Sequence, residues 1–118
     1  MIKGANTTIM VRDMEKAVRF YVDVLGLKQK ARYGDHFAQV EVTGTIIALH
    51  PTNDNAPRAE GQAGISIGFA VDDLDATMGE LRAKGVEFSG TADDAQVKLA
   101  FFTDPDGTPL YLSQNKWV

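Results

Sequence analysis

The sequence contains no cysteine in its 118 residues. Disulfide bonds, thiolate metal sites and cysteine nucleophiles are therefore excluded together. The absence does not identify the redox compartment, but a reducing cytosol requires no cysteine. We expect a cytoplasmic protein.

Basic side chains are also too few and too scattered to form a nucleic-acid-binding patch. The chain has 12 Lys and Arg against 16 Asp and Glu, which gives a net charge of −4. Nucleic acids and anionic membranes are bound through clustered positive charge. We therefore expect neither as a partner.

Long hydrophobic runs are missing as well. No window approaches the roughly 18 apolar residues of a membrane-spanning helix. The first residues, "MIKGANTTIMVRDM", lack the continuous apolar core of a signal peptide. Hydrophobic residues nevertheless make up 44% of the chain, which is enough for an ordinary folded interior.

What the sequence does contain is an internal repeat. Residues 9–17, "IMVRDMEKA", align with residues 69–77, "FAVDDLDAT". Each copy passes from an apolar strand through Asp at the N-cap of a helix, where its side chain can accept from a free backbone N–H. A chance similarity of two strand–Asp–helix segments is the alternative interpretation.

Each copy predicts one amphipathic helix and three strands after it. The helices end at Gly26 and Gly85, as expected for left-handed C-terminal caps. Their apolar residues recur at helical spacing: Met14, Ala17, Val18, Tyr21 and Leu25 in the first, and Leu74, Met78 and Leu81 in the second. The predicted strands cover residues 27–33, 36–42 and 45–51, then 85–90, 97–104 and 109–114.

The predicted fold class is α+β, with two βαβββ modules forming curved mixed sheets around a cleft. The modules cover residues 1–52 and 64–118, and residues 53–63 form a linker rich in Asn, Pro, Gly and charge. Residues 1–118 then make a single domain. Sheet edges and a concave face need cover, so we expect a homodimer.

Three blocks carry a resemblance to a known family. They are "MVRDMEKAVRFYVDVLGLK" (10–28), "FAVDDLDATMGELRAKGVEF" (69–88) and "FFTDPDGTPLYLSQ" (101–114). In this order and spacing the chain resembles the vicinal oxygen chelate superfamily, which includes glyoxalase I, bleomycin resistance proteins and extradiol dioxygenases. The resemblance implies paired βαβββ modules, commonly in a dimer.

The resemblance also identifies where a metal would be held. Enzymes of this family usually bind one divalent metal through four His, Gln or Glu side chains, one on each of four strands. The matching positions here are Asn6, Ala48, Ser66 and Tyr111. None of these is a competent ligand for a catalytic divalent ion. We therefore expect no metal and no other cofactor.

The same strands predict a ligand-binding surface instead. Alternation along a strand puts Thr8 on the face of Asn6 and His50 on the face of Ala48. Aromatic residues of the strands can stack on a planar ligand. The predicted ligand-binding residues are Asn6, Thr8, His50, Ser66, Tyr111, Phe37 and Phe101.

The two histidines have alternative interpretations. His50 lies in the cleft if its strand reaches residue 50, and is otherwise a solvent-exposed residue at a strand end. His36 follows a turn and is expected to be exposed. No catalytic residue can be assigned from the sequence.

Three functions fit these observations. The first is metal-independent binding of an apolar or aromatic small molecule, antibiotic-like ligands included, as in the bleomycin resistance branch. The second is an enzyme, either a lyase or isomerase of the glyoxalase type or a dioxygenase-type enzyme, with a displaced or absent metal site. The third is a structural homodimer without catalysis.

Overall fold

The computed structural model describes residues 1, 3–52 and 65–116. The chain divides into two compact units, Met1–Glu60 and Gly61–Val118. Each unit contains one βαβββ module, so the predicted α+β fold with two modules is confirmed. Most of the predicted linker, residues 53–63, lies outside the described residues.

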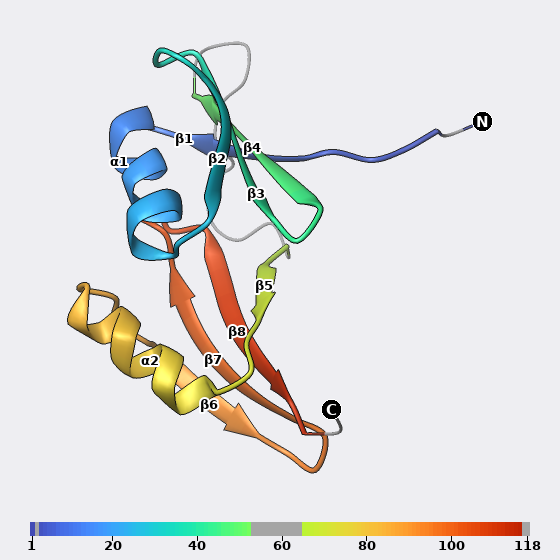
Figure 1. The fold of residues 1–118 in the computed structure, drawn as a ribbon, viewed down its shortest axis with the longest axis vertical. Coiled ribbons are helices and arrows are strands. Elements are labelled where there is room, and N and C mark those ends of the chain that lie inside the picture. The colour runs from blue at the N-terminus through green and yellow to red at the C-terminus, as the bar shows by residue number, and fades with distance from the viewer. Residues whose placement is uncertain (2, 53–64, 117–118) are drawn as a thin grey trace. The chain divides into compact units, whose positions relative to one another are not determined.

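The first unit is a four-stranded mixed sheet with one helical segment (Figure 1). The strand order is β1-β4-β3-β2, with β1 parallel to β4 and the other neighbours antiparallel. The elements are β1 (Thr7–Val11), α1 (Met14–Val18), η1 (Arg19–Val24), β2 (Lys28–Tyr33), β3 (Phe37–Val42) and β4 (Thr45–Pro51).

The second unit repeats this topology. Its strand order is β5-β8-β7-β6, with β5 parallel to β8. The elements are β5 (Ile67–Ala70), α2 (Leu74–Ala83), β6 (Gly90–Asp93), β7 (Val97–Thr103) and β8 (Pro109–Asn115). Among the described residues, no helix is long and apolar enough to cross a membrane.

Alternate strand residues form the core of each unit with the apolar face of its helix. In the first unit the buried strand residues are Ile9, Val11, Ala38, Val40, Ile47 and Leu49. In the second they are Ala100, Phe102, Leu110 and Leu112. Burying such side chains stabilises a fold by roughly 1.5–3 kcal/mol each. The residues between them point to the opposite face of each sheet.

Both helices begin and end where the sequence predicted. The side chain of Asp13 accepts from the backbone N–H of Lys16, and that of Asp73 from the N–H of Ala76, both at 3.1 Å. Gly26 and Gly85 have φ angles of +79° and +97°. This left-handed region favours glycine because it has no β-carbon.

The first helix is not α-helical along its whole length. Residues Arg19–Val24 form a π-helix, in which the N–H of Leu25 donates to the carbonyl of Phe20 at 2.9 Å. The buried face is nevertheless the predicted one, and Tyr21 is completely buried within it. A π segment is rare because its hydrogen bonds span five residues rather than four.

The strand predicted at residues 85–90 was wrong. Strand β6 begins only at Gly90, and residues 86–89 before it form neither helix nor strand. Val86 is buried there, and the Phe88 ring packs against Phe102 with the centroids 5.4 Å apart. The alternating apolar residues Val86 and Phe88 therefore mark side chains that pack with the core, and not a paired strand.

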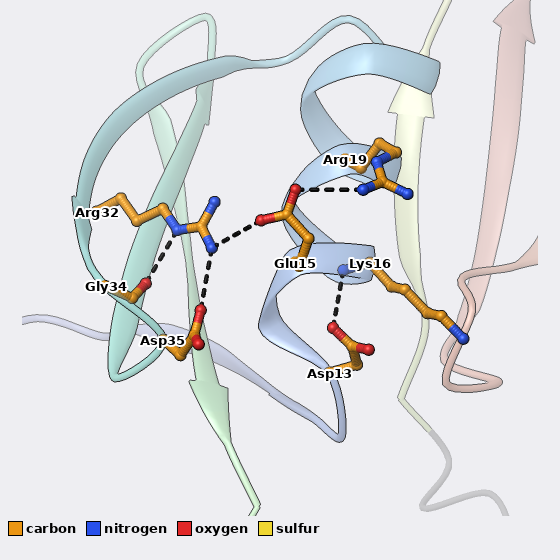
Figure 2. Close-up of polar contacts among 7 residues, drawn as sticks. All are labelled: Asp13, Glu15, Lys16, Arg19, Arg32, Gly34 and Asp35. Carbon is orange, nitrogen blue, oxygen red and sulfur yellow. Dashed lines mark hydrogen bonds and ion pairs between the residues drawn. The ribbon is translucent and has the colours of Figure 1, made fainter.

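An ion-pair network connects the first helix to the β2–β3 turn (Figure 2). One nitrogen of the Arg32 guanidinium, Nη2, donates to Glu15 Oε2 at 3.0 Å and to Asp35 Oδ1 at 3.1 Å, while Nε donates to the carbonyl of Gly34 at 2.9 Å. Arg19 reaches the second oxygen of Glu15 at 3.3 Å. Arg32 thereby fixes the turn between Tyr33 and Phe37.

Candidate functional site

Each sheet has one face turned away from the buried core, which we call its open face. On the first sheet, strand alternation places Thr8 and Met10 of β1, Ile46, Ala48 and His50 of β4, and Phe37, Gln39 and Glu41 of β3 on this face. Most of these side chains are half-buried. The open face is therefore the candidate ligand-binding surface.

A hollow of about 430 Å³ lies at one end of the first sheet. Ala48 is directly opposite Thr8 on one side and Gln39 on the other, and its methyl group leaves space between them. Asn6 precedes β1 and lines the same hollow. The lining residues are Ala5, Asn6, Thr7, Gln39, Gly44, Thr45, Ile46 and Ala48, none of them charged.

The only charged groups on this open face lie toward its β2 edge, as far as the described residues show. Lys28 is paired with Glu41 across the strands, and Lys30 Nζ lies 4.0 Å from Glu41 Oε2. A β-bulge between Gln29 and Ala31 adds Lys30 to this edge. The hollow itself offers neutral amide and hydroxyl groups.

The second sheet has an aromatic side chain at the position that corresponds to Ala48. Tyr111 on β8 is paired with Gly68 on β5, and its ring lies directly over the Gly68 backbone. A β-carbon placed on Gly68 would overlap the ring and the phenolic oxygen of Tyr111. Glycine at residue 68 is therefore what lets Tyr111 lie flat on the sheet.

Phe101 continues this aromatic surface on the next strand. It is paired with Tyr111, and the two ring centroids are 6.4 Å apart. Phe102, the next residue, is buried in the core, as alternation requires. The described strands place no Asp, Glu, Lys or Arg on this open face.

The structure places the predicted ligand-binding residues on both sheets. Thr8, Phe37 and His50 are on the open face of the first, with Asn6 at the hollow. Phe101 and Tyr111 are on the open face of the second, and Ser66 is exposed just before β5. That all of them line one cavity stays a prediction.

The structure decides between the two alternatives for the position of His50, and it confirms that His36 is exposed. Strand β4 extends to Pro51, so His50 is part of the sheet and half-buried. Its Nδ1 atom lies 2.8 Å from the carbonyl oxygen of Pro51. His36 is exposed in the β2–β3 turn.

The sequence did not identify Gly68 or Gln39 as residues of the open faces. It also did not identify the pairing of Tyr33 with Phe37. The importance of Gly68 depends on its pairing with Tyr111, which joins strands far apart in the sequence. Tyr33 is paired with Phe37 across a short turn, with centroids 6.2 Å apart. A hairpin register drawn around "GDH" would have found that pair.

Comparison with known proteins agrees with this architecture. Residues 5–111 match the sequence profile of the Glyoxalase/Bleomycin resistance protein/Dioxygenase superfamily. The chain belongs to this superfamily.

Relatives in the superfamily have different described activities. A probable lactoylglutathione lyase of Vibrio parahaemolyticus is 29% identical over 94% of this chain and 89% of its own. A lactoylglutathione lyase of Haemophilus influenzae is 28% identical over 94% and 91%. The solved structure of TnmS3, an antibiotic binding protein from Streptomyces sp. CB03234, is 27% identical with a TM-score of 0.71, over 98% of this chain and 99% of that one.

The side chains at the four positions that the family resemblance identifies do not fit a catalytic divalent metal. Asn6 offers a weak amide oxygen and Ala48 has no donor at all. Ser66 and Tyr111 offer only hydroxyl groups, which are not among the His, Gln and Glu ligands that the resemblance implies. Within residues 1, 3–52 and 65–116, no group of three or more His, Cys, Asp and Glu side chains could hold a metal ion.

Proposed function

We propose that the protein binds a neutral, largely apolar and planar small molecule without a metal. The observation that carries this proposal is the open face of the second sheet, where Tyr111 lies flat on Gly68 beside Phe101. The family resemblance matches Tyr111 to the position of a metal-binding carboxylate. None of the described strand residues on this open face is charged.

The hollow of the first sheet supports the same ligand class. Its amide and hydroxyl groups can donate to and accept from polar substituents, while Ile46 and Ala48 contribute apolar surface. Burying a phosphate or carboxylate against such a lining would leave its charge without compensation, which is costly. A mostly apolar ligand with a few hydrogen-bonding groups fits better. TnmS3, named as an antibiotic binding protein, supports including antibiotic-like ligands in this class.

A glyoxalase-type lyase is the second candidate, because relatives 28–29% identical are named lactoylglutathione lyases. The residues at the metal positions argue against it. Such an enzyme would need a displaced metal site. A structural homodimer without ligand is the third candidate.

The test is a binding screen of neutral planar aromatic compounds, run with and without EDTA. We expect binding that chelation does not change and that Tyr111→Ala weakens by about 1–3 kcal/mol through lost stacking. Tyr111→Phe is the matched control, since it keeps the ring and should retain most of the affinity. Metal analysis of protein purified without added ions accompanies the screen.

One result would overturn the proposal: near one equivalent of a divalent metal, lost on chelation together with an activity. An unchanged affinity in Tyr111→Ala for every ligand found would remove Tyr111 from the site. We also propose that the protein is a homodimer in the cytoplasm. Light scattering at micromolar concentration that gives the mass of one 12.8 kDa chain would contradict the dimer.

A further inference from the structure

His50 belongs to a row of four side chains, one from each strand, that crosses the first sheet. Met10 on β1 is paired directly with His50 on β4. Strands β3 and β4 are antiparallel and pair Ala38 with Leu49, so the next residues, Phe37 and His50, are neighbours. Phe37 is in turn paired with Tyr33 on β2. Each of the four strands contributes one side chain to this row on the open face.

The row is apolar apart from the imidazole and the phenol. The Tyr33 and Phe37 rings are tilted by 31° with centroids 6.2 Å apart, and Tyr33 is 66% exposed. Arg32 holds the turn between these two residues through Gly34, Asp35 and Glu15 (Figure 2). The aromatic end of the row is therefore attached to the first helix and is not a loose hairpin tip.

The hydrogen bond of His50 fixes which ring nitrogen carries the proton. A carbonyl oxygen can only accept, so the 2.8 Å contact with Pro51 requires the hydrogen on Nδ1. In the neutral ring Nε2 is then left with a lone pair and acts as an acceptor. The ligand partner that matches this atom is a donor.

We propose that the row Met10–His50–Phe37–Tyr33 binds a planar aromatic group carrying an O–H or N–H donor, which donates to His50 Nε2. The inference rests on the proposed small-molecule function and assigns a ligand chemistry to the first sheet. Phe37, Tyr33 and Met10 supply apolar contact with the ring, and His50 selects for the donor. Tyr111 and Gly68 belong to the second sheet and are not members of this row.

Phenol and anisole are the probes, because they differ in whether the oxygen carries a hydrogen. A long-range ¹H–¹⁵N correlation spectrum of labelled protein reports the tautomer of each imidazole. The chain has 2 histidines, so His36→Gln assigns the signals. We expect the Nδ1–H tautomer at His50 in the free protein.

Phenol should then shift the His50 Nε2 resonance with a dissociation constant about tenfold below that of anisole, as one hydrogen bond provides. Anisole is the more apolar probe, so apolar burial alone would favour it instead. His50→Leu should abolish the preference for phenol. His50→Gln, whose side-chain carbonyl can still accept, should retain part of it.

Three results would overturn the inference: an Nε2–H tautomer in the free protein, equal affinity for the two probes, or no effect of either probe at His50. Its failure is distinguishable from failure of the proposed function. If another neutral ligand still binds and Tyr111→Ala weakens it, only the His50 site is wrong. If phenol is preferred at His50 while Tyr111→Ala changes nothing, the inference holds and the role of Tyr111 is wrong.

Discussion

The two sheets share one topology but present opposite surfaces at equivalent positions. In the first sheet Ala48 lies between Thr8 and Gln39, and the missing side-chain volume leaves a hollow. In the second, Tyr111 lies between Gly68 and Phe101, and its ring covers the neighbouring strand. The two positions that the family resemblance matches to metal ligands thus differ in opposite ways, Ala48 with almost no side chain and Tyr111 with a large ring.

This difference shows that the two copies of the repeat share their backbone topology but not the side chains of their open faces. The core-facing residues of both sheets are interchangeable aliphatic and aromatic side chains that satisfy the same helix–sheet packing. The open faces do not pack against the helix of their own unit, so helix–sheet packing does not constrain their residues. The open faces can therefore differ: the first has a hollow lined by neutral polar and apolar residues, and the second has the Tyr111–Phe101 aromatic surface.

The largest effect is expected when the close approach of Tyr111 to Gly68 is broken. Gly68→Ala places a methyl group where the ring lies, and overpacking of this kind costs about 1–3 kcal/mol of unfolding free energy. Urea denaturation measures it. The double variant with Tyr111→Ala should recover most of the loss because the clash is gone.

Gly90→Ala is the matched control for that experiment. Gly90 is paired with Phe101 in the same cross-strand row, but a β-carbon there meets nothing within 4 Å. It should leave stability unchanged or slightly raised, since alanine restricts the unfolded chain more than glycine. Equal destabilisation by the two substitutions would show that the Tyr111 ring does not lie on Gly68.

A smaller effect is expected at the start of the second helix. The side-chain oxygen of Gln114 accepts from the backbone N–H of Leu74 at 2.7 Å, while the equivalent residue of the first unit, Pro51, has no side-chain oxygen. Gln114→Ala should lower the unfolding free energy by about 1 kcal/mol by leaving this N–H without its partner. Gln114→Glu keeps an acceptor and should retain the stability. A neutral Gln114→Ala variant in urea denaturation would contradict the capping role.

The smallest effects concern two exposed carboxylates whose pKa values lie below their ordinary range for different reasons. The side-chain hydrogen bond from Arg32 lowers the pKa of Glu15 in the first unit. Backbone hydrogen bonds, first from Gln96 and then from Val97, lower the pKa of Asp94 in the second. A lowered folded-state pKa means a contribution that is present above the unfolded-state pKa and lost as the pH falls through the folded-state value.

Glu15→Gln and Asp94→Ala should therefore each destabilise the protein near neutral pH, and the effect should shrink as the pH falls below the ordinary carboxylate pKa toward the lowered folded-state pKa. High salt should reduce the effect of Glu15→Gln, because its partner is a charged side chain in solvent. It should reduce that of Asp94→Ala less, because backbone N–H groups are the partners. Denaturation midpoints at two pH values and two salt concentrations make the comparison. Equal salt sensitivity would contradict the assigned causes.

The sequence predicted the elements whose signals are local. Asp13, Asp73, Gly26 and Gly85 each act within a few residues, and strand alternation identified the faces of Thr8, His50 and Tyr111. The role of Gly68 could not be predicted, because it depends on a register between strands more than forty residues apart. The hollow at Ala48 likewise depends on three strands at once. The strand prediction for residues 85–90 was wrong because buried side chains outside a strand can give the same apolar alternation as a paired strand.

The π-helix of the first unit has a consequence for the length of the repeat. Gly26 stands thirteen residues after Asp13, whereas Gly85 stands twelve after Asp73, so the first copy has one residue more between the same two caps. A π turn accommodates one extra residue without rotating the helix that precedes it. The bond from Leu25 to Phe20 absorbs that residue, and Gly26 still ends the helix in a left-handed cap. The one-residue difference between the two copies thus coincides with Arg19–Val24, and the strands that follow have the same order in both units.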